Sequence, residues 1–261
     1  MMGYVIQASS GEVLVIDGGN AGDADELERV IMSVGGHAHL WLMTHPHSDH
    51  YGAPIALLGR DTEVTFDRFG ASVLTEEWGS ALEEEVERRE LSEWNAYAPT
   101  LGDKLFELRA GQKFELGSMT VEILAGANPE ITQNPLNNQS CVIRVTEDGF
   151  RFLILGDLGL EAGCKLLESG IDLRADGVQM AHHGQKGVNE AFYRAVSPSY
   201  AFWPTPLWLW VNSRSRLIVP DSASFHTPIT VEWMRRLKTF NVVAFSETMC
   251  FDTLSKTLYP Y

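Results

Sequence analysis

Three histidines and one aspartate lie within the short segment Thr44-His45-Pro46-His47-Ser48-Asp49-His50, directly after an apolar run at residues 40–43. Neutral imidazole and carboxylate are the ligands that borderline divalent metals such as zinc prefer. A turn just past a strand end can aim alternate side chains at one point. We therefore expect His45 and His47 to hold one ion and Asp49 and His50 to hold a second ion close by. A single pair of histidines would carry little weight, because histidine more often serves as an ordinary hydrogen-bonding residue.

This segment resembles the HxHxDH signature of the metallo-β-lactamase-fold hydrolases, and other motifs of that family follow in the family's order. The resemblance covers almost the whole chain, and it rests also on the segments 13–19, 152–157, 181–184 and 225–228. The combination of Asn138 and Ser140 with the later motifs looks most like the branch that contains the hydrolase-like domain of DNA-internalisation competence proteins and a phosphorylcholine esterase of teichoic acid. True β-lactamases carry an isolated histidine between the second motif and the metal-bridging residue. This chain has no histidine between His50 and His182, so β-lactam hydrolysis is not expected.

The resemblance implies a metal centre with two ions and a bridging carboxylate. It assigns one ion to His45, His47 and one of His182 or His183, the other ion to Asp49, His50 and His226, and the bridge to Asp157. Of the histidine pair we favour His182 as the ligand, because it comes first after the apolar strand expected at 178–181. His183 would then support a ligand or face the substrate, and with Asp49 and Asp157 it completes the expected catalytic set. We expect Asp17 to hydrogen-bond the ligands without binding metal.

The expected activity is hydrolysis by a metal-bound hydroxide, because two ions lower the pKa of bound water and polarise the bond under attack. A small phosphoester or phosphodiester is the favoured substrate, and a lactone, thioester or amide is the alternative within the same chemistry. Zinc is the default metal, with manganese or iron as alternatives. The oxygen- and nitric-oxide-reducing relatives carry a carboxylate where His47 stands and usually a flavin domain, and neither occurs here. The alternative from a different class of function is a non-catalytic metal-binding module. It is disfavoured because a structural zinc site has four protein ligands, whereas seven candidate ligands shared by two ions leave positions open for water.

Several further residues are candidates for contact with substrate. Asn138 and Ser140 could donate to it, although a polar pair at a strand start serves the backbone equally well. Trp203 and Trp208 belong to an aromatic segment with two prolines at 203–210, for which a substrate wall, core packing and a dimer contact all remain open. Lys186, Arg214 and Arg216 could attract a small anionic ester. A Glu-rich helical stretch at 75–94, with Leu74, Trp78, Leu82 and Val86 at four-residue spacing, is either a surface helix or part of a lid at about 75–110 that also carries Trp94 and Tyr97.

Length and composition agree with a globular enzyme that acts on a small molecule. The 261 residues are 44% hydrophobic, enough for one sizeable core, and the formal charge is −15, with 20 Lys and Arg against 35 Asp and Glu. This charge argues against a nucleic-acid partner, since proteins that bind nucleic acids normally carry a basic surface. Three widely spaced cysteines and an N-terminus without a signal-peptide pattern indicate reduced thiols and a cytoplasmic protein that is not bound to a membrane. Nothing in the sequence indicates an oligomeric state.

Periodicity predicts a single α/β domain over residues 1–261, built as a four-layer αββα metallo-β-lactamase-like sandwich of two mixed sheets. A helix is expected from Asp23 to the glycine pair at 35–36, because Asp23 and Glu26 resemble a capping box. Further helices are expected at 161–169, 189–196 and 230–238. Strands are expected at 4–7, 12–16, 39–43, 63–66, 113–116, 120–124, 141–145, 150–155, 178–181, 201–203 and 242–245.

Overall fold

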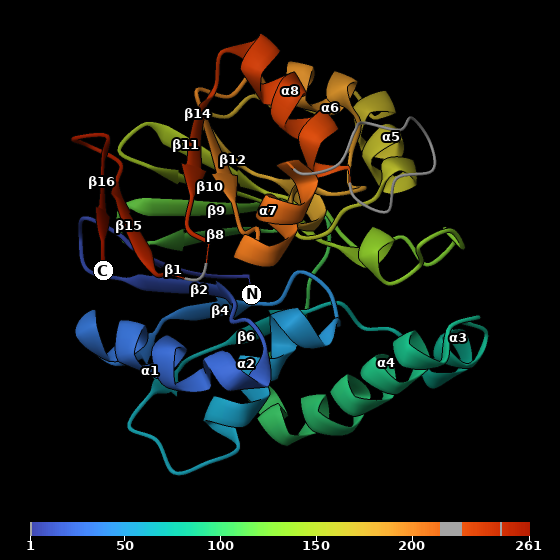
Figure 1. The fold of residues 1–261 in the computed structure, drawn as a ribbon. Coiled ribbons are helices and arrows are strands. Elements are labelled where there is room, and N and C mark those ends of the chain that lie inside the picture. The colour runs from blue at the N-terminus through green and yellow to red at the C-terminus, as the bar shows by residue number, and fades with distance from the viewer. Residues whose placement is uncertain (1, 215–225, 246) are drawn as a thin grey trace.

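Two β-sheets face each other in the computed structural model, which describes residues 2–214, 226–245 and 247–261 and only the backbone of 211–214 (Figure 1). The first sheet has five strands in the order β1 (Gly3–Gln7), β2 (Val13–Asp17), β4 (Leu40–Leu42), β6 (Phe69–Ala71) and β7 (Leu105–Glu107). β1 and β2 form an antiparallel hairpin, whereas the pairs β2/β4, β4/β6 and β6/β7 are parallel. The sheet is therefore mixed, and the carboxyl ends of the four parallel strands β2, β4, β6 and β7 lie at one edge.

The second sheet has seven strands and is also mixed. Their order is β14 (Phe240–Val243), β13 (Tyr200–Trp203), β12 (Gly177–Gln179), β11 (Phe150–Ile154), β10 (Val142–Glu147), β9 (Met119–Ala125) and β8 (Lys113–Leu116). The strands from β8 to β11 are antiparallel to their neighbours, and those from β11 to β14 are parallel. The parallel half again gathers several carboxyl ends at one edge.

Helices cover the outer face of each sheet, which gives the predicted four layers (Figure 1). The first sheet is covered by α1 (Ala24–Ser33), α2 (Ser48–Leu58) and α4 (Glu85–Tyr97), and the second by α5 (Leu160–Glu168), α6 (Glu190–Val196) and α8 (Thr227–Leu237). β2 shows why the layers form. Val13 and Val15 pack with the helices, while Leu14 and Ile16 pack between the sheets, so this strand is apolar on both faces.

The remaining elements are short. β3 (His37–Ala38) pairs with β5 (Thr65–Phe66), α3 (Glu76–Ser80) precedes α4, and α7 (Leu207–Arg214) precedes α8. The hairpin of β15 (Met249–Asp252) and β16 (Thr257–Pro260) packs through Phe251 on Phe150, Tyr200 and Phe202 of the second sheet. Cys141, Cys164 and Cys250 are free thiols, as expected. Over the described ranges, every helix is too short or too polar to cross a bilayer.

Two segments differ from their predicted form. The stretch 75–94 is two helices, because the chain leaves α3 near Gly79 and Ser80, residues with lower helix propensity than alanine. Leu82 then packs inward with Leu91 and Leu136. The break shifts the phase, so that Val86 is 43% exposed and does not continue a buried stripe. The aromatic segment 203–210 is not one loop, since Trp203 ends β13 and residues from Leu207 onward form α7.

Candidate metal centre

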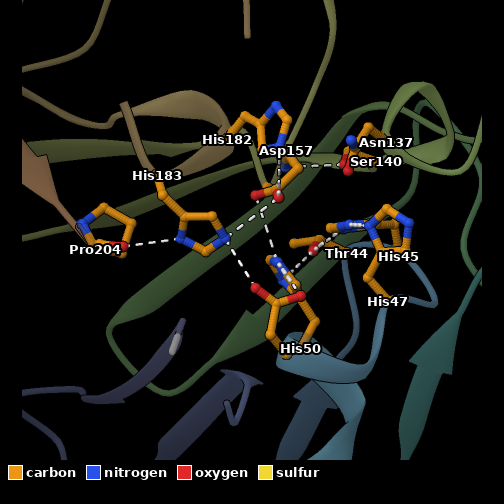
Figure 2. A network of polar contacts seen from close by, with 12 residues as sticks. Thr44, His45, His47, His50, Asn137, Ser140, Asp157, His182, His183 and Pro204 are labelled. Carbon is orange, nitrogen blue, oxygen red and sulfur yellow. Dashed lines mark hydrogen bonds and ion pairs between the residues drawn. The ribbon is translucent and has the colours of Figure 1, made fainter. Parts of the chain in front are cut away.

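The site lies at the carboxyl ends of strands from both sheets. Asp17 ends β2, the segment from Thr44 to His50 follows β4 and begins α2, Asp157 follows β11, and His183 follows β12. Parallel strands present their carboxyl ends at one edge, which is where α/β proteins commonly bind ligands. Figure 2 shows the side chains of His50, which follows β4 of the first sheet, and His183, which follows β12 of the second, both directed toward Asp157. Long-range sheet pairing therefore brings together residues that are far apart in sequence.

Two groups of potential ligand atoms form there. One group comprises His45, His47 and Asp157, the other Asp49, His50 and His183, and within each the ligand atoms lie within 4.8 Å of one another. His45 Nε2 lies 3.0 Å from His47 Nδ1. In the other group His183 Nε2 lies 3.0 Å from Asp49 Oδ2.

Asp157 lies between the groups. Its Oδ1 is 3.4 Å from His50 Nε2 and its Oδ2 is 3.3 Å from His183 Nε2. The carboxylate is 3% exposed, and its backbone N–H donates to Ser140 Oγ at 3.0 Å. Asp157 thus has the position that a bridging carboxylate requires.

Three of the four imidazoles in these groups are held through the ring nitrogen that points away from the centre. Asp17 Oδ2 accepts from His50 Nδ1 at 2.9 Å, and Pro204 O accepts from His183 Nδ1 at 2.8 Å. The Thr44 hydroxyl donates to Asp17 Oδ2, so it is free to accept from His45 Nδ1 at 3.2 Å. Metal-binding histidines almost always donate their second N–H in this way, which fixes the tautomer and the ring plane.

Several of the converging atoms lack a hydrogen bond. Across the part of the chain that the structure describes, His50 Nε2, His183 Nε2 and Asp157 Oδ1 are buried and make none, although they lie close enough for ion pairs. Burying such groups without a partner is costly. Divalent cations would satisfy all three atoms at once, so the residues present fit a metal centre.

The electrostatics of the site also fit bound cations. Burial would lower the pKa of His183, but Asp157 and Asp49 outweigh it and raise that pKa to about 10. Burial would also lower the pKa of His50. The negative charges of Asp157, Asp17 and Asp49 outweigh this effect and raise that pKa well above its usual value. The carboxylates therefore create a negative potential that favours positive charge at the imidazole positions. Burial, followed by the neighbouring imidazoles, holds the pKa of His45 well below its usual range, so that ring is neutral.

The backbone is constrained where it delivers the second sheet's residues. His182 and His183 both have positive φ, at 51° and 54°, which is uncommon for residues with a side chain. Gly184 follows at φ 77°, and a Cβ there would lie 2.4 Å from the Trp203 ring. A Cβ on Gly156 would meet the Ser140 hydroxyl at 2.8 Å. Both turns thus depend on glycine to bring Asp157 and His183 close to the first sheet.

The pairing of ligands differs from the one expected. The structure brings His183, not His182, into a group, and it places His183 with Asp49 and His50, whereas the preferred prediction placed His182 with His45 and His47. Two consecutive left-handed residues explain the difference, because they rotate the first imidazole outward and the second inward. His182 is 25% exposed, with its Nε2 3.9 Å from Asp157 Oδ2. His226 directly precedes α8 and belongs to neither group among the described residues, so its role as a ligand stays a prediction.

Asn138 and Ser140 support the backbone, one of the two roles that the sequence left open. Both are fully buried. Asn138 Oδ1 accepts from Ala162 N at 3.2 Å and its amide donates to Glu161 at 2.9 Å, while Ser140 Oγ accepts from Asp157 N. Neither side chain is exposed to meet a substrate. Asp17, in contrast, has the expected supporting place, since it is buried and accepts from Thr44 and His50.

The two tryptophans proposed to contact substrate differ in exposure. Trp203 is 1% exposed, packs on Trp210 and donates to Asn241 at 2.8 Å, so it is part of the core and not a substrate wall. Trp208 is 54% exposed on α7 and remains a candidate for substrate contact. Lys186 is exposed beside His182. The Arg214 side chain and Arg216 lie outside the described residues.

The stretch 75–94, for which the sequence left a surface helix and a lid open, packs against the rest of the domain. Trp94 is 2% exposed and lies beside Phe69 and Tyr51 in the core of the first half, so it does not cover the metal centre. Trp78 Nε1 donates to Pro129 O at 2.8 Å, and Leu82 and Leu91 pack with Leu136. These contacts anchor α3 and α4 to the loop that leads to Ser140.

Sequence reasoning missed two contributors to the site. Thr44 links Asp17 to His45, and its place directly before the His45-to-His50 motif was an available signal. Glu90 on α4 contacts the motif from 42 residues away, through a Ser48 Oγ to Glu90 Oε1 hydrogen bond of 2.6 Å. One glutamate in a Glu-rich helix gives no signal of such a contact.

The chain has the metallo-β-lactamase fold, as comparison with solved structures shows. The metallo-β-lactamase fold protein YhfI from Bacillus subtilis aligns with a TM-score of 0.54 over 98% of this chain and 90% of its own, at 14% identity. MEM-A1, a subclass B3 metallo-β-lactamase from a soil metagenome library, aligns over 69% of this chain and 72% of its own with a TM-score of 0.44 and 19% identity. No protein-family profile and no curated protein sequence matches the chain. The likeness establishes the fold, and the competence-protein branch stays a prediction.

Proposed function

We propose that this protein is a metal-dependent hydrolase with a centre for two divalent ions. His45, His47 and Asp157 would hold one ion, Asp49, His50 and His183 the other, with Asp157 between them. The observation that carries the proposal is the buried cluster of His50 Nε2, His183 Nε2 and Asp157 Oδ1, which converge without hydrogen bonds. A closed structural zinc site has four protein ligands, whereas these groups of three leave positions for water and substrate.

Two bound ions would supply an activated water at neutral pH and a Lewis acid that polarises the scissile bond. The chain's own residues prepare the geometry. Asp17, Thr44 and Pro204 O orient three of the imidazoles so that their remaining nitrogens face the centre. Burial of Asp157 and His50 strengthens the electrostatic interactions there.

His182 is the half-buried imidazole at the opening of the centre, and we assign it the substrate-facing role first expected of His183. Its Nδ1 lies 3.4 Å from Lys186 O, a weak contact that leaves the ring free to adjust. From there it can donate a hydrogen bond to substrate or a proton to a leaving group.

The favoured substrate is a small phosphoester or phosphodiester, which rests on the resemblance of the sequence motifs. The formal charge of −15 supports a small substrate over a nucleic acid. Zinc is the first metal to test, followed by manganese and iron.

Metal content tests the centre. Protein purified without chelator and then loaded with zinc should contain about two ions per chain by elemental analysis, because the six ligand residues are too many for one tetrahedral ion. A loaded protein that held one ion or fewer would contradict the two-ion centre.

A substrate panel tests the reaction. Protein loaded with each metal should hydrolyse small activated phosphodiesters, with little turnover of β-lactams and no tight binding of duplex DNA at physiological salt. The Asp157→Ala variant is the matched blank, because it removes the shared carboxylate. Faster turnover of lactones or thioesters than of phosphodiesters would move the substrate assignment to carbonyl compounds and leave the metal centre intact.

A further inference from the structure

The imidazole of His47 differs from the other three in how it is supported. His45, His50 and His183 each direct the outward ring nitrogen to an oxygen at 2.8–3.2 Å. The inward nitrogen of His47 is Nδ1, which faces His45 Nε2, so its outward nitrogen is Nε2. Glu90 Oε2 lies 3.9 Å from that nitrogen.

Glu90 is well placed to serve His47. It lies on α4, its side chain is 13% exposed, and its Oε1 accepts from Ser48 Oγ at 2.6 Å. The Tyr51 hydroxyl lies 3.1 Å from Glu90 O and thereby ties the helix to α2. Ser48 therefore holds the carboxylate and Tyr51 holds the backbone of Glu90, which leaves Oε2 3.9 Å from His47 Nε2.

We propose that Glu90 is a positioning residue for the metal centre: its carboxylate accepts a hydrogen bond from His47 Nε2–H and directs Nδ1 to the ion shared with His45 and Asp157. This inference rests on the proposed metal centre. Its physical reason is that an imidazole needs a fixed tautomer and ring plane to bind metal, and a carboxylate on the outward nitrogen supplies both. Helix α4, for which the sequence left a surface helix and a lid open, then positions a metal ligand.

Metal titration of substituted proteins tests the role. Competition of each protein with a chromogenic chelator for zinc should show that Glu90→Gln and Glu90→Ala bind one of the two ions about 10–100-fold more weakly than wild type, the usual effect of losing such a partner. Gln can still accept from Ser48, but its single oxygen cannot also serve His47 as a carboxylate does. Glu85→Gln is the matched control, since Glu85 is an exposed acid of the same helix and its loss should leave both affinities unchanged.

Cobalt spectra locate the effect. Asp49→Ala should retain only the ion bound by His45, His47 and Asp157, and adding Glu90→Gln to that variant should weaken this ion and shift its cobalt absorption bands. Thermal unfolding of the metal-free proteins should give equal midpoints for Glu90→Gln and Glu85→Gln.

The possible results distinguish failure of the role of Glu90 from failure of the metal centre itself. Wild-type affinity and cobalt bands in Glu90→Gln, with two ions still bound, would overturn the role of Glu90 and leave the metal centre standing. A wild-type protein that took up no zinc or cobalt would overturn the metal centre and this inference together.

Discussion

The tautomer of each imidazole is set by its hydrogen-bond partners, which the spacing of histidines in the sequence does not predict. The motif from His45 to His50 was sufficient to predict that potential metal ligands gather near β4, because the ligand types and their density are unusual. It was not sufficient to choose between His182 and His183. That choice depends on the left-handed backbone of both residues, which points successive side chains in directions that a strand or helix would not.

Substitution of the late histidines distinguishes the possible ligand sets. We expect His183→Ala to lose one of two ions, because His183 lies 3.0 Å from Asp49 and 3.3 Å from Asp157, and His182→Ala to keep both ions while activity falls. Elemental analysis and turnover of the same preparations measure this. Loss of an ion from His182→Ala with none from His183→Ala would restore the original assignment. His226→Ala, tested alongside, would reveal an additional ligand if it too lost an ion.

Asp157 and Asp17 should respond differently to substitution. Asp157→Ala removes the carboxylate that contacts both His50 and His183, so we expect loss of both ions and of activity. Asp17→Asn removes a charge that orients His50 and Thr44 without itself joining a ligand group, so we expect metal affinity to fall about 10–100-fold. Zinc titration of the two variants makes the comparison. Equal losses would mean that ligands and supporting residues have been separated incorrectly.

At the scale of elements, strands and helices with a regular pattern were predicted well. β8 coincides with the expected 113–116, and α1 and α5 with the expected helices within a residue or two. The predictions failed where tertiary contacts override local pattern. Leu82 leaves the helical phase to join Leu91 and Leu136, and Trp94 is held in the core by Phe69 and Tyr51. β6 and β7 were not predicted, since each has only a few residues and owes its form to pairing with a neighbour.

Two substitutions on α4 test the phase of that helix. Trp94→Ala should lower the free energy of unfolding by about 3–5 kcal/mol, because a large side chain that is 2% exposed leaves a cavity. Val86→Ala should change it by less than about 0.5 kcal/mol, because Val86 is 43% exposed. Urea unfolding followed by circular dichroism measures both. A large loss in Val86→Ala would support the unbroken stripe through 74, 78, 82 and 86.

At the scale of the whole molecule, the candidate centre joins the two halves of the sandwich. Asp49 and His50 come from the half built on the first sheet, and Asp157 and His183 from the half built on the second. The sheets already share an apolar interface that includes Leu14, Leu42 and Ile154. The metal-free chain should therefore remain folded, while bound ions add a second link between the halves at the strand ends.

Metal removal should consequently lower the stability of the entire domain. A ligand that binds only the folded state stabilises it by about 4 kcal/mol when its free concentration is 1,000 times Kd. For a chain of this size each kcal/mol shifts Tm by about 2–4 °C, so chelation should lower Tm by roughly 8 °C or more in one cooperative transition. Calorimetry before and after dialysis against a chelator measures the shift, and restoring zinc should reverse it. Asp157→Ala provides the control, because it lacks the carboxylate between the groups and should show little response to chelator. If chelation instead produced two separate transitions in the wild-type protein, the apolar interface would be too weak to couple the sheets, and the ions would be the main link between them.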